Sequence, residues 1–247
     1  MKKLLAHRKL LIGSLIVFLL AGLGSYFYFS HQQNELDQTT QTVQQSAVKA
    51  MRKKEKQQEK TSSDQNLSSS SAPVVNSENE KALRVKSKNQ PDYEGKDVKP
   101  LTLKAMRKVN AEKVVSSFGV GTIEIPSIGM NLPILEGMSQ ENLSVGAGTM
   151  KPNQELGKGN FTLAGHYMTN AGLLFGGIKN VKQNDSVQVT YKNKTMNFKV
   201  TTVKHITAED NQVIFDSEGN GILTLITCDS SVAGTDGRLM VRAVLSQ

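Results

Sequence analysis

The chain has 247 residues, 30 basic and 22 acidic side chains, and a formal net charge of +8. Residues 1–30 contain four basic groups and no acidic one, residues 31–112 contain 15 basic and 11 acidic groups, and residues 113–247 contain 11 of each. A nucleic-acid-binding domain needs its positive charge clustered on the folded surface. The neutral C-terminal half therefore excludes this class, and we expect no nucleic-acid partner.

Residues 10–30 contain no charged side chain and predict one transmembrane helix. About 20 apolar residues are needed to cross ~30 Å of hydrocarbon. Four aromatic side chains at residues 26–29 end the segment, as in the aromatic belt of a membrane interface. A cleaved signal peptide is the alternative, but the segment is longer than the apolar part of a typical signal peptide and ends in residues too bulky for a cleavage site. We therefore expect an uncleaved signal anchor.

The basic residues indicate the orientation of this segment. The four basic residues of the N-terminus lie within residues 1–9, and the next basic residue is Lys49. Positive charge beside a membrane segment stays on the cytoplasmic side. We therefore expect a single-pass protein of the cell membrane, with residues 1–9 in the cytoplasm and everything after residue 30 outside.

Residues 31–100 predict a linker. They are rich in Gln, Ser, Lys, Glu and Asn and contain one aromatic side chain, Tyr93. So little apolar surface cannot offset the entropy lost on ordering the backbone. We expect a disordered or partly helical, flexible stalk that holds a domain away from the membrane. A local helix over 43–60 would be solvated and marginally stable.

Residues 101–247 form the predicted folded domain. Apolar residues at 103, 106, 109 and 114 predict an amphipathic helix that ends near residue 116. Short β-type runs separated by turn residues follow at 121–125, 132–136, 160–164, 186–191, 194–206, 222–227 and 239–245. Seven or eight short strands in about 130 residues predict a mainly β domain, either a small barrel or a sandwich.

Cys228 is the only cysteine in the chain and lies where the apolar run 222–227 ends. In an exported protein, an unpaired cysteine indicates either an intermolecular disulfide or a reactive thiol. A thiol becomes nucleophilic when nearby cations stabilise its thiolate. An acyl-transfer site also needs a proton carrier and donors for the oxyanion. Arg238 begins the next β run, so a hairpin would bring its guanidinium to the thiol.

Four histidines are candidates for the proton carrier. His7 and His31 flank the apolar segment and are excluded by their position, and His205 lies within an alternating strand and is expected on the surface. His166 follows a β run and a glycine, so it lies at a strand end as Cys228 does. His166 is therefore the predicted partner of the thiol.

The residues alone leave two interpretations open. Cys228, His166 and Arg238 can together form a catalytic site. Alternatively each has a structural role, because a lone cysteine is often a small buried hydrophobe and Arg238 can pair with a carboxylate such as that of Asp236. The spacing of the residues does not decide between them.

Three groups of residues occur in the order found in the sortases. They are Ile125-Pro-Ser-Ile-Gly-Met-Asn-Leu-Pro-Ile134 with Leu143-Ser-Val-Gly-Ala-Gly-Thr149, then Leu163-Ala-Gly-His166, then Leu223-Thr-Leu-Ile-Thr-Cys228 followed by Arg238. Residues 118–245 thus resemble class A sortases, the housekeeping sortase A of Gram-positive bacteria, especially the streptococcal type. The resemblance implies a sortase-type closed β-barrel of about eight strands with a few short helices, and makes 101–247 a sortase catalytic domain.

The resemblance also implies an activity. Sortases are cysteine transpeptidases that cleave a Leu-Pro-x-Thr-Gly (LPXTG) sorting signal between Thr and Gly and hold the surface protein as a thioester. They then transfer it to the amine of a peptidoglycan precursor, lipid II. Cys228 would be the nucleophile, His166 the acid and then the base, and Arg238 the donor to the oxyanion or to substrate carbonyls. The implied partners are LPXTG-bearing surface proteins, lipid II and the membrane.

The same resemblance implies a set of substrate-binding residues. Thr227, next to the nucleophile, would position substrate or donate to the oxyanion. The Leu-Pro pocket would be formed by Ala164, Val213, Ile214 and Ile226, although each of these is also a plausible core residue. Some relatives bind calcium through a cluster of acidic residues, but the segment between residues 148 and 166 contains one acid, Glu155. We therefore expect no cofactor, no metal and no calcium requirement.

Three other functions are alternatives to a wall-anchoring sortase. A papain-like hydrolase places its cysteine before its histidine and at a helix start, which is the reverse of the order here. A membrane-tethered, non-enzymatic β-domain that binds the cell wall remains an alternative. A pilin-polymerising sortase is a nearer one, but these commonly carry a lid and a second, C-terminal membrane segment, and none is evident at residues 244–247. The wall-anchoring role is therefore favoured.

Overall fold

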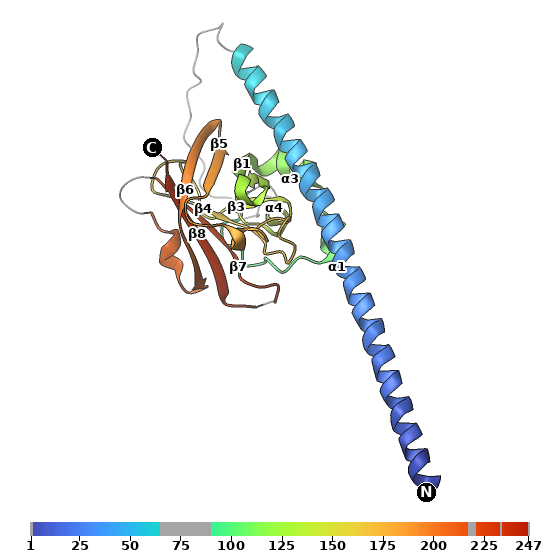
Figure 1. Cartoon of the computed structure of the whole chain (residues 1–247). Coiled ribbons are helices and arrows are strands. Elements are labelled where there is room, and N and C mark those ends of the chain that lie inside the picture. Colours follow the sequence, from blue (N-terminus) through green and yellow to red (C-terminus); the bar gives the residue numbers. More distant parts are fainter. Residues whose placement is uncertain (1, 65–89, 217–220, 233, 247) are drawn as a thin grey trace, which may run out of the picture.

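The protein is described by a computed structural model that covers residues 2–64, 90–216, 221–232 and 234–246, with side chains described from residue 18 to 58 of the first range. Eight strands form one closed barrel in the order β1-β2-β3-β4-β7-β8-β6-β5 (Figure 1). The strands are β1 Gly119–Ile125, β2 Met130–Leu135, β3 Ala147–Thr149, β4 Asn160–Ala164, β5 Ser186–Tyr191, β6 Lys194–Thr207, β7 Ile222–Cys228 and β8 Gly237–Leu245. The predicted mainly β fold and closed barrel of about eight strands are confirmed, and the sandwich that the strand pattern alone also allowed is excluded.

The helices are few and mostly short. They are α1 Lys2–Asp64, α2 Leu103–Met106, α3 Ala111–Phe118 and α4 Gln140–Val145, with 3₁₀ turns η2 Pro126–Ile128, η3 Ile178–Asn180 and η4 Asn211–Ile214. The predicted single helix from 103 to 116 was wrong, because it is broken into α2 and α3. Asn110 begins α3 as its N-cap, and its side chain accepts a hydrogen bond from the N–H of Lys113 at 2.9 Å.

Two strands that are far apart in sequence, β4 and β7, are neighbours in the barrel and pair in parallel, with Leu163 opposite Leu225 and Ala164 opposite Ile226. Parallel strands bring their C-terminal ends to the same edge. The residues that follow β4 and those that end β7 therefore lie together at one end of the barrel.

Side chains alternate across these strands. Phe161, Leu163, Leu223 and Leu225 belong to the barrel core and are at most 1% exposed. Because successive side chains in a strand point to opposite faces, Ala164, Ile226 and Cys228 lie on the outer face of the barrel. The nucleophile candidate thus stands on a strand whose other face is fully packed.

The helix α1 is 63 residues long, about 95 Å at 1.5 Å per residue, and it lies along one side of the barrel (Figure 1). Val43, Ala47 and Met51 are buried on the domain in a second apolar cluster that includes Val115 and Leu135. The predicted solvated, marginal helix at 43–60 therefore differs from the structure. The reason is a stripe in steps of three to four residues at Leu36, Thr40, Val43, Ala47 and Met51, which packs one face of the helix on the domain.

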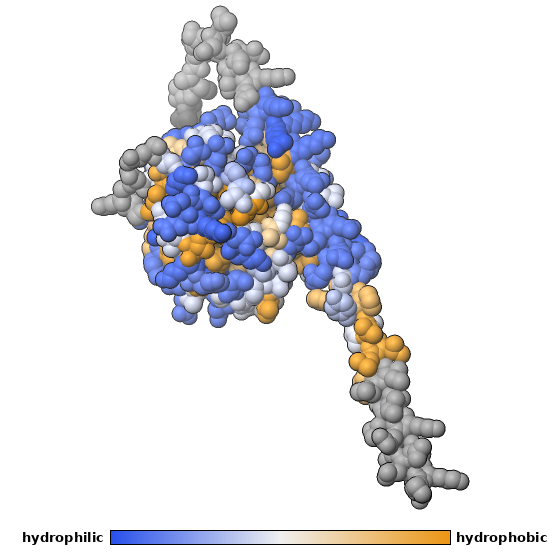
Figure 2. Space-filling model, in the orientation of Figure 1, coloured by the Kyte–Doolittle hydropathy of each residue, from blue (hydrophilic) through white to orange (hydrophobic). Residues whose placement is uncertain are grey.

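The predicted membrane segment 10–30 lies partly outside the described residues, because no side chain before Phe18 is described. Within the described part of the chain, none of the helices combines the length and the apolarity needed to cross a bilayer. Exposed apolar side chains, from Phe18 to Phe29, gather where α1 leaves the domain, and appear orange in Figure 2.

Candidate active site

A cavity of about 880 Å³ opens at the end of the barrel where β4, β7 and β8 meet. His166, Cys228 and Arg238 all line this cavity. The structure thus brings together the three residues that the sequence predicts as catalytic, although their sequence positions span more than 70 residues. Their catalytic roles stay predictions.

Cys228 is the last residue of β7 and is a free, half-buried thiol. Its register partner on the antiparallel strand β8 is Arg238. The two side chains are therefore neighbours on the same face of a hairpin, which is the arrangement that the sequence predicts.

The guanidinium of Arg238 is held by the loop that joins β7 to β8. Its Nη1 donates to the carbonyl of Thr235 at 2.6 Å and to the carbonyl of Gly237 at 2.9 Å. Within the described residues, Nη1 is the one guanidinium nitrogen that makes these hydrogen bonds. The other N–H groups of the rigid fork are left for a carbonyl or oxyanion bound in the cavity.

Asp229 fixes this loop. Its backbone N–H donates to the carbonyl of Gly237 at 3.2 Å, and its Oδ1 accepts from the hydroxyl of Thr235, also at 3.2 Å. A Cβ at position 237 would lie 1.8 Å from Oδ2 of Asp229, so only glycine permits this close approach. The short loop therefore presents Arg238 in one orientation.

His166 is 8% exposed and lies two residues after the end of β4. The backbone around it is fixed on both sides, because the N–H of Gly165 donates to the carbonyl of Ile226 at 3.1 Å and the N–H of Phe175 donates to the carbonyl of His166 at 3.1 Å. A Cβ at Gly165 would lie 2.4 Å from the ring of Phe175. Glycine is therefore required directly before the histidine.

Gln140 is the polar neighbour of the imidazole. Its Oε1 accepts from the backbone N–H of Lys99 at 2.7 Å, which turns its amide nitrogen toward Nε2 of His166 at 3.3 Å. Since an amide nitrogen only donates, Nε2 of His166 is the acceptor and the ring is neutral with its proton on Nδ1. Burial of the ring lowers the pKa of His166 from its ordinary value near 6.5 to about 4.

The predicted substrate-binding residues fall into two groups. Ala164 and Ile226 are register partners on the outer face of β4 and β7, beside Cys228. Thr227 is 3% exposed, and its hydroxyl donates to the carbonyl of Gly165 at 2.8 Å. Its observed contact therefore ties the nucleophile strand to the histidine segment, while contact with substrate stays a prediction.

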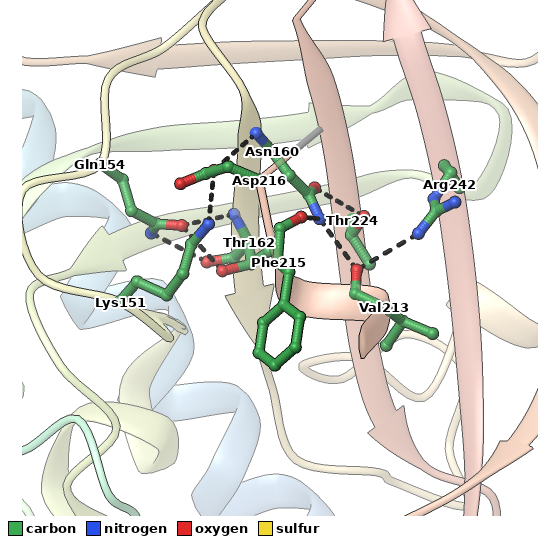
Figure 3. A network of polar contacts seen from close by, with 9 residues as sticks. All are labelled: Lys151, Gln154, Asn160, Thr162, Val213, Phe215, Asp216, Thr224 and Arg242. Carbon is green, nitrogen blue, oxygen red and sulfur yellow. Dashed lines mark hydrogen bonds and ion pairs between the residues drawn. The ribbon is translucent and has the colours of Figure 1, made fainter. Parts of the chain in front are cut away.

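Val213 and Ile214 lie in η4, within the connection between β6 and β7, and are half-buried. A polar network attaches this connection to the barrel (Figure 3). Nδ2 of the buried Asn160 donates to the carbonyls of Val213, at 2.8 Å, and Phe215, at 3.1 Å. Arg242 of β8 also donates to the Val213 carbonyl, at 3.2 Å.

The same network continues past Asn160. Its Oδ1 accepts from the hydroxyl of Thr224 at 2.8 Å, and its backbone N–H donates to Oδ1 of Asp216 at 3.0 Å. Lys151 pairs with that carboxylate at 2.7 Å and holds the pKa of Asp216 below its ordinary value. Three chain segments are thereby joined at the outer face of β4 and β7.

Sequence reasoning missed Gln140, Asn160 and the contribution of α1 to the cavity. A glutamine in a six-residue helix carries no periodic signal, and Asn160 is identified only by the backbone carbonyls that accept its hydrogen bonds.

Within the described residues, no group of three or more His, Cys, Asp or Glu side chains could hold a metal ion. The expectation of metal independence stays a prediction.

Comparison with known proteins gives consistent matches. A family model described as the sortase domain matches residues 123–246. Sortase A of Bacillus anthracis is 40% identical over 111 residues, which covers 45% of this chain and 52% of that protein, about half its length. Sortase A of Listeria monocytogenes is 36% identical over 157 residues, which covers 63% of this chain and 70% of that protein.

The solved structure of Listeria monocytogenes sortase A agrees with the barrel described above. It superposes with a TM-score of 0.50 at 36% identity, over 52% of this chain and 88% of that structure. A barrel end that carries histidine, cysteine and arginine in one cavity, together with these matches, shows that the chain belongs to the sortase family, as a class A sortase.

Proposed function

We propose that this class A sortase is a cysteine transpeptidase that cleaves an LPXTG sorting signal between Thr and Gly and transfers the surface protein to the amine of a peptidoglycan precursor. The observation that supports it is the convergence of Cys228, His166 and Arg238 on one cavity. The neutral imidazole, the half-buried thiol and the cation supply a base, a nucleophile and an oxyanion donor.

In the first half of the reaction, Nε2 of neutral His166 exchanges its contact with the Gln140 amide for the proton of the Cys228 thiol. The sulfur attacks the carbonyl carbon of the substrate threonine, and a C–S bond forms. The Thr–Gly C–N bond then breaks, and His166 returns its proton to the departing glycine amine. A thioester on Cys228 and a neutral imidazole remain.

In the second half, the acceptor amine attacks the thioester carbonyl and gives a proton to His166. A C–N bond forms, the C–S bond breaks, and the sulfur of Cys228 takes the proton back. The negative oxygen that develops in each half is the group that the unused N–H donors of Arg238 suit best. The enzyme thus returns to its starting protonation state.

The outer face of β4 and β7 suits the apolar half of the signal. Ala164 and Ile226 lie beside Cys228, and the connection that carries Val213 and Ile214 is attached to the same face by Asn160. A Leu-Pro pair offers few hydrogen bonds and depends on the fit of an apolar groove. These four residues are proposed as its walls, with no metal or other cofactor.

Residues 10–30 are proposed to anchor the protein in the cell membrane, with residues 1–9 in the cytoplasm and residues 101–247 outside. The partners are then an LPXTG-bearing surface protein and the amine of lipid II, both of which meet the enzyme at the membrane. The supporting observations are the uncharged segment 10–30 and the exposed apolar side chains from residue 18 to 29.

Mass spectrometry tests the proposal on the full chain in detergent. With an LPXTG peptide and triglycine, we expect a mass increase on Cys228 that equals the acyl fragment, and a peptide joined to triglycine. Cys228→Ala should abolish both, while Cys228→Ser controls for the shape of the side chain. If ligation persists in Cys228→Ala, the mechanism is wrong and the non-enzymatic wall-binding alternative gains no support either.

A further inference from the structure

One wall of the cavity around Cys228 comes from the N-terminal helix. Phe29, Gln33, Leu36 and Asp37 of α1 line the cavity together with His166, Cys228 and Arg238. These four helical residues are spaced by four, three and one positions, so they lie on one face of the helix. The helix that the sequence assigns to a stalk therefore borders the catalytic residues.

Apolar packing, hydrogen bonds of a lysine and one ion pair hold α1 in this position. Leu36 packs against the second apolar cluster, which buries Val43, Ala47 and Met51. Further along, Nζ of Lys54 donates to the carbonyls of Val115, Ser116 and Gly119 at 2.9 to 3.3 Å. A cation beside the C-terminal end of α3 interacts favourably with the negative end of the helix dipole. Near the cavity, Arg107 pairs with Glu35 at 3.3 Å.

Two further bonds join α1 directly to the loop that follows His166. Nδ2 of Asn170 donates to Oδ2 of Asp37 at 3.0 Å, and Oδ1 of Asn170 accepts from the N–H of Gly172, which fixes the orientation of the amide. Oε1 of Gln44 accepts from the N–H of Leu174 at 2.9 Å. The wall is thus connected to the segment that holds the imidazole.

The α1 wall, which consists of Phe29, Gln33, Leu36 and Asp37, carries one negative charge. Asp37 is the one acidic residue among those that line the described cavity, where the fixed cations are Lys99 and Arg238. Its described partner is the neutral amide of Asn170, and no ion pair of Asp37 occurs within the described residues. A half-buried carboxylate without a cationic partner favours the approach of a positively charged group.

We propose that the α1 wall forms the acceptor side of the active site and that the carboxylate of Asp37 recruits the protonated amine of the acceptor. This inference rests on the proposed function. The groove proposed for Leu-Pro follows the outer face of β4 and β7, whereas the α1 wall lies beyond the ends of those strands. Donor and acceptor would then approach Cys228 from different sides.

The chemistry of the second half-reaction fits this arrangement. The acceptor amine is an ammonium ion at neutral pH, and Asp37 raises its concentration beside the thioester. The bound ammonium ion loses one proton to water, which frees the nitrogen lone pair. The amine then attacks the thioester carbonyl as the C–S bond breaks, and its second proton passes through His166 to the sulfur of Cys228. The acceptor is therefore of the class of primary amines on a peptide chain. Asp37 lies about 12 Å along the helix from residue 29, so the amine would bind within that distance of residue 29.

The experiment uses the full chain in detergent, an LPXTG peptide as donor and triglycine as the ammonium acceptor. Asp37→Asn retains a side chain of the same shape, and Asp236→Asn removes an exposed carboxylate from the neighbouring β7–β8 loop, outside the cavity lining. We expect Asp37→Asn to raise the KM for triglycine about two- to fivefold, the range of a partly exposed ion pair, while Asp236→Asn leaves it unchanged. Hydroxylamine, which is neutral at pH 7.5, should show no difference.

The rate of acylation separates this inference from the proposed function. If wild type forms no acyl adduct on Cys228, the proposed function fails. If the adduct forms at equal rates in wild type and Asp37→Asn but the KM for triglycine is also equal, the acceptor role of Asp37 is overturned. An equal rise in KM for triglycine and hydroxylamine would likewise overturn it, because charge would not be the cause.

Discussion

The side-chain amide of Gln140 donates to Nε2 of His166 across 3.3 Å, in an orientation set by the backbone N–H of Lys99. The lone pair that a proton would occupy is therefore already engaged, and the ring is also buried. Both features favour the neutral imidazole. The neutral imidazole is the form of the ring that can act as a base.

The first prediction concerns the acid limb of the plot of kcat/KM against pH. Because the pKa of His166 is lowered to about 4, kcat/KM for the donor peptide should rise around pH 4 and stay high through neutrality. Gln140→Ala removes the donor to Nε2 and admits water to the ring, so its acid limb should move upward, toward pH 6.5. Gln140→Glu should move it further, since a carboxylate stabilises the imidazolium. An unchanged limb in both variants contradicts this role for Gln140.

The second prediction links the same group to stability. The pKa of His166 is lower in the folded chain than in the unfolded chain, so the unfolded chain binds more protons between pH 6.5 and 4. The contribution is fully present above pH 6.5 and is lost as pH falls toward 4, by up to about 3 kcal/mol. Urea unfolding of wild type and His166→Gln at pH 7 and pH 4.5 measures it. Equal losses in the two proteins would disprove the linkage.

The third prediction concerns the connection between β6 and β7. Asn160→Ala removes both donors to the carbonyls of Val213 and Phe215, each worth about 1 kcal/mol. The groove wall should loosen, and the KM for the donor peptide should rise about tenfold with little change in the KM for triglycine. Asn197→Ala, on the exposed face of β6, serves as the control. A rise confined to the acceptor KM would refute the assignment.

The fourth prediction tests the docking of α1. Ala47 is fully buried between the helix and the domain, so Ala47→Glu places an unpaired charge there at a cost of about 3 kcal/mol. We expect trypsin to cleave rapidly at the basic residues 49–56 in this variant. Gln45→Glu, on the exposed side, should be cleaved as slowly as wild type. Equal protection of the two variants would mean that the helix is not held by this contact.

The fifth prediction concerns metals. The segments that meet at Asp216 are joined by protein contacts, with Lys151 as the cation. We therefore expect kcat/KM to stay unchanged after chelator treatment and after addition of calcium. A calcium-dependent increase in donor affinity would show that this ion pair is not sufficient.

Much of the barrel could be predicted because its strands are long enough to show alternation or a continuous apolar run. The strands β4, β5, β6 and β7 were predicted to within one residue. β3 could not be, because Ala147–Thr149 is three small residues without a pattern. The packing of α1 was missed because its polar composition outweighed a single stripe of apolar side chains.

Some residues of the site could be predicted from the sequence and others could not. Cys228 and Arg238 are joined by a hairpin, so local spacing sufficed to pair them. His166 was selected by its position after a β run and a glycine, but its approach to the thiol depends on the parallel pairing of β4 with β7, which was not predicted. Gln140, Asn160 and Asp37 act through contacts across 26 to 133 residues. No local pattern encodes such contacts.

The parallel pairing of β4 with β7 also has a consequence for folding. The bond from Thr227 to Gly165 joins positions 62 residues apart, and contacts of such separation form slowly because a long loop must close first. Thiol and imidazole therefore meet only after β4 and β7 have paired across this loop. A newly made chain should stay inert toward peptides until then, so recovery of activity during refolding reports the pairing of these two strands.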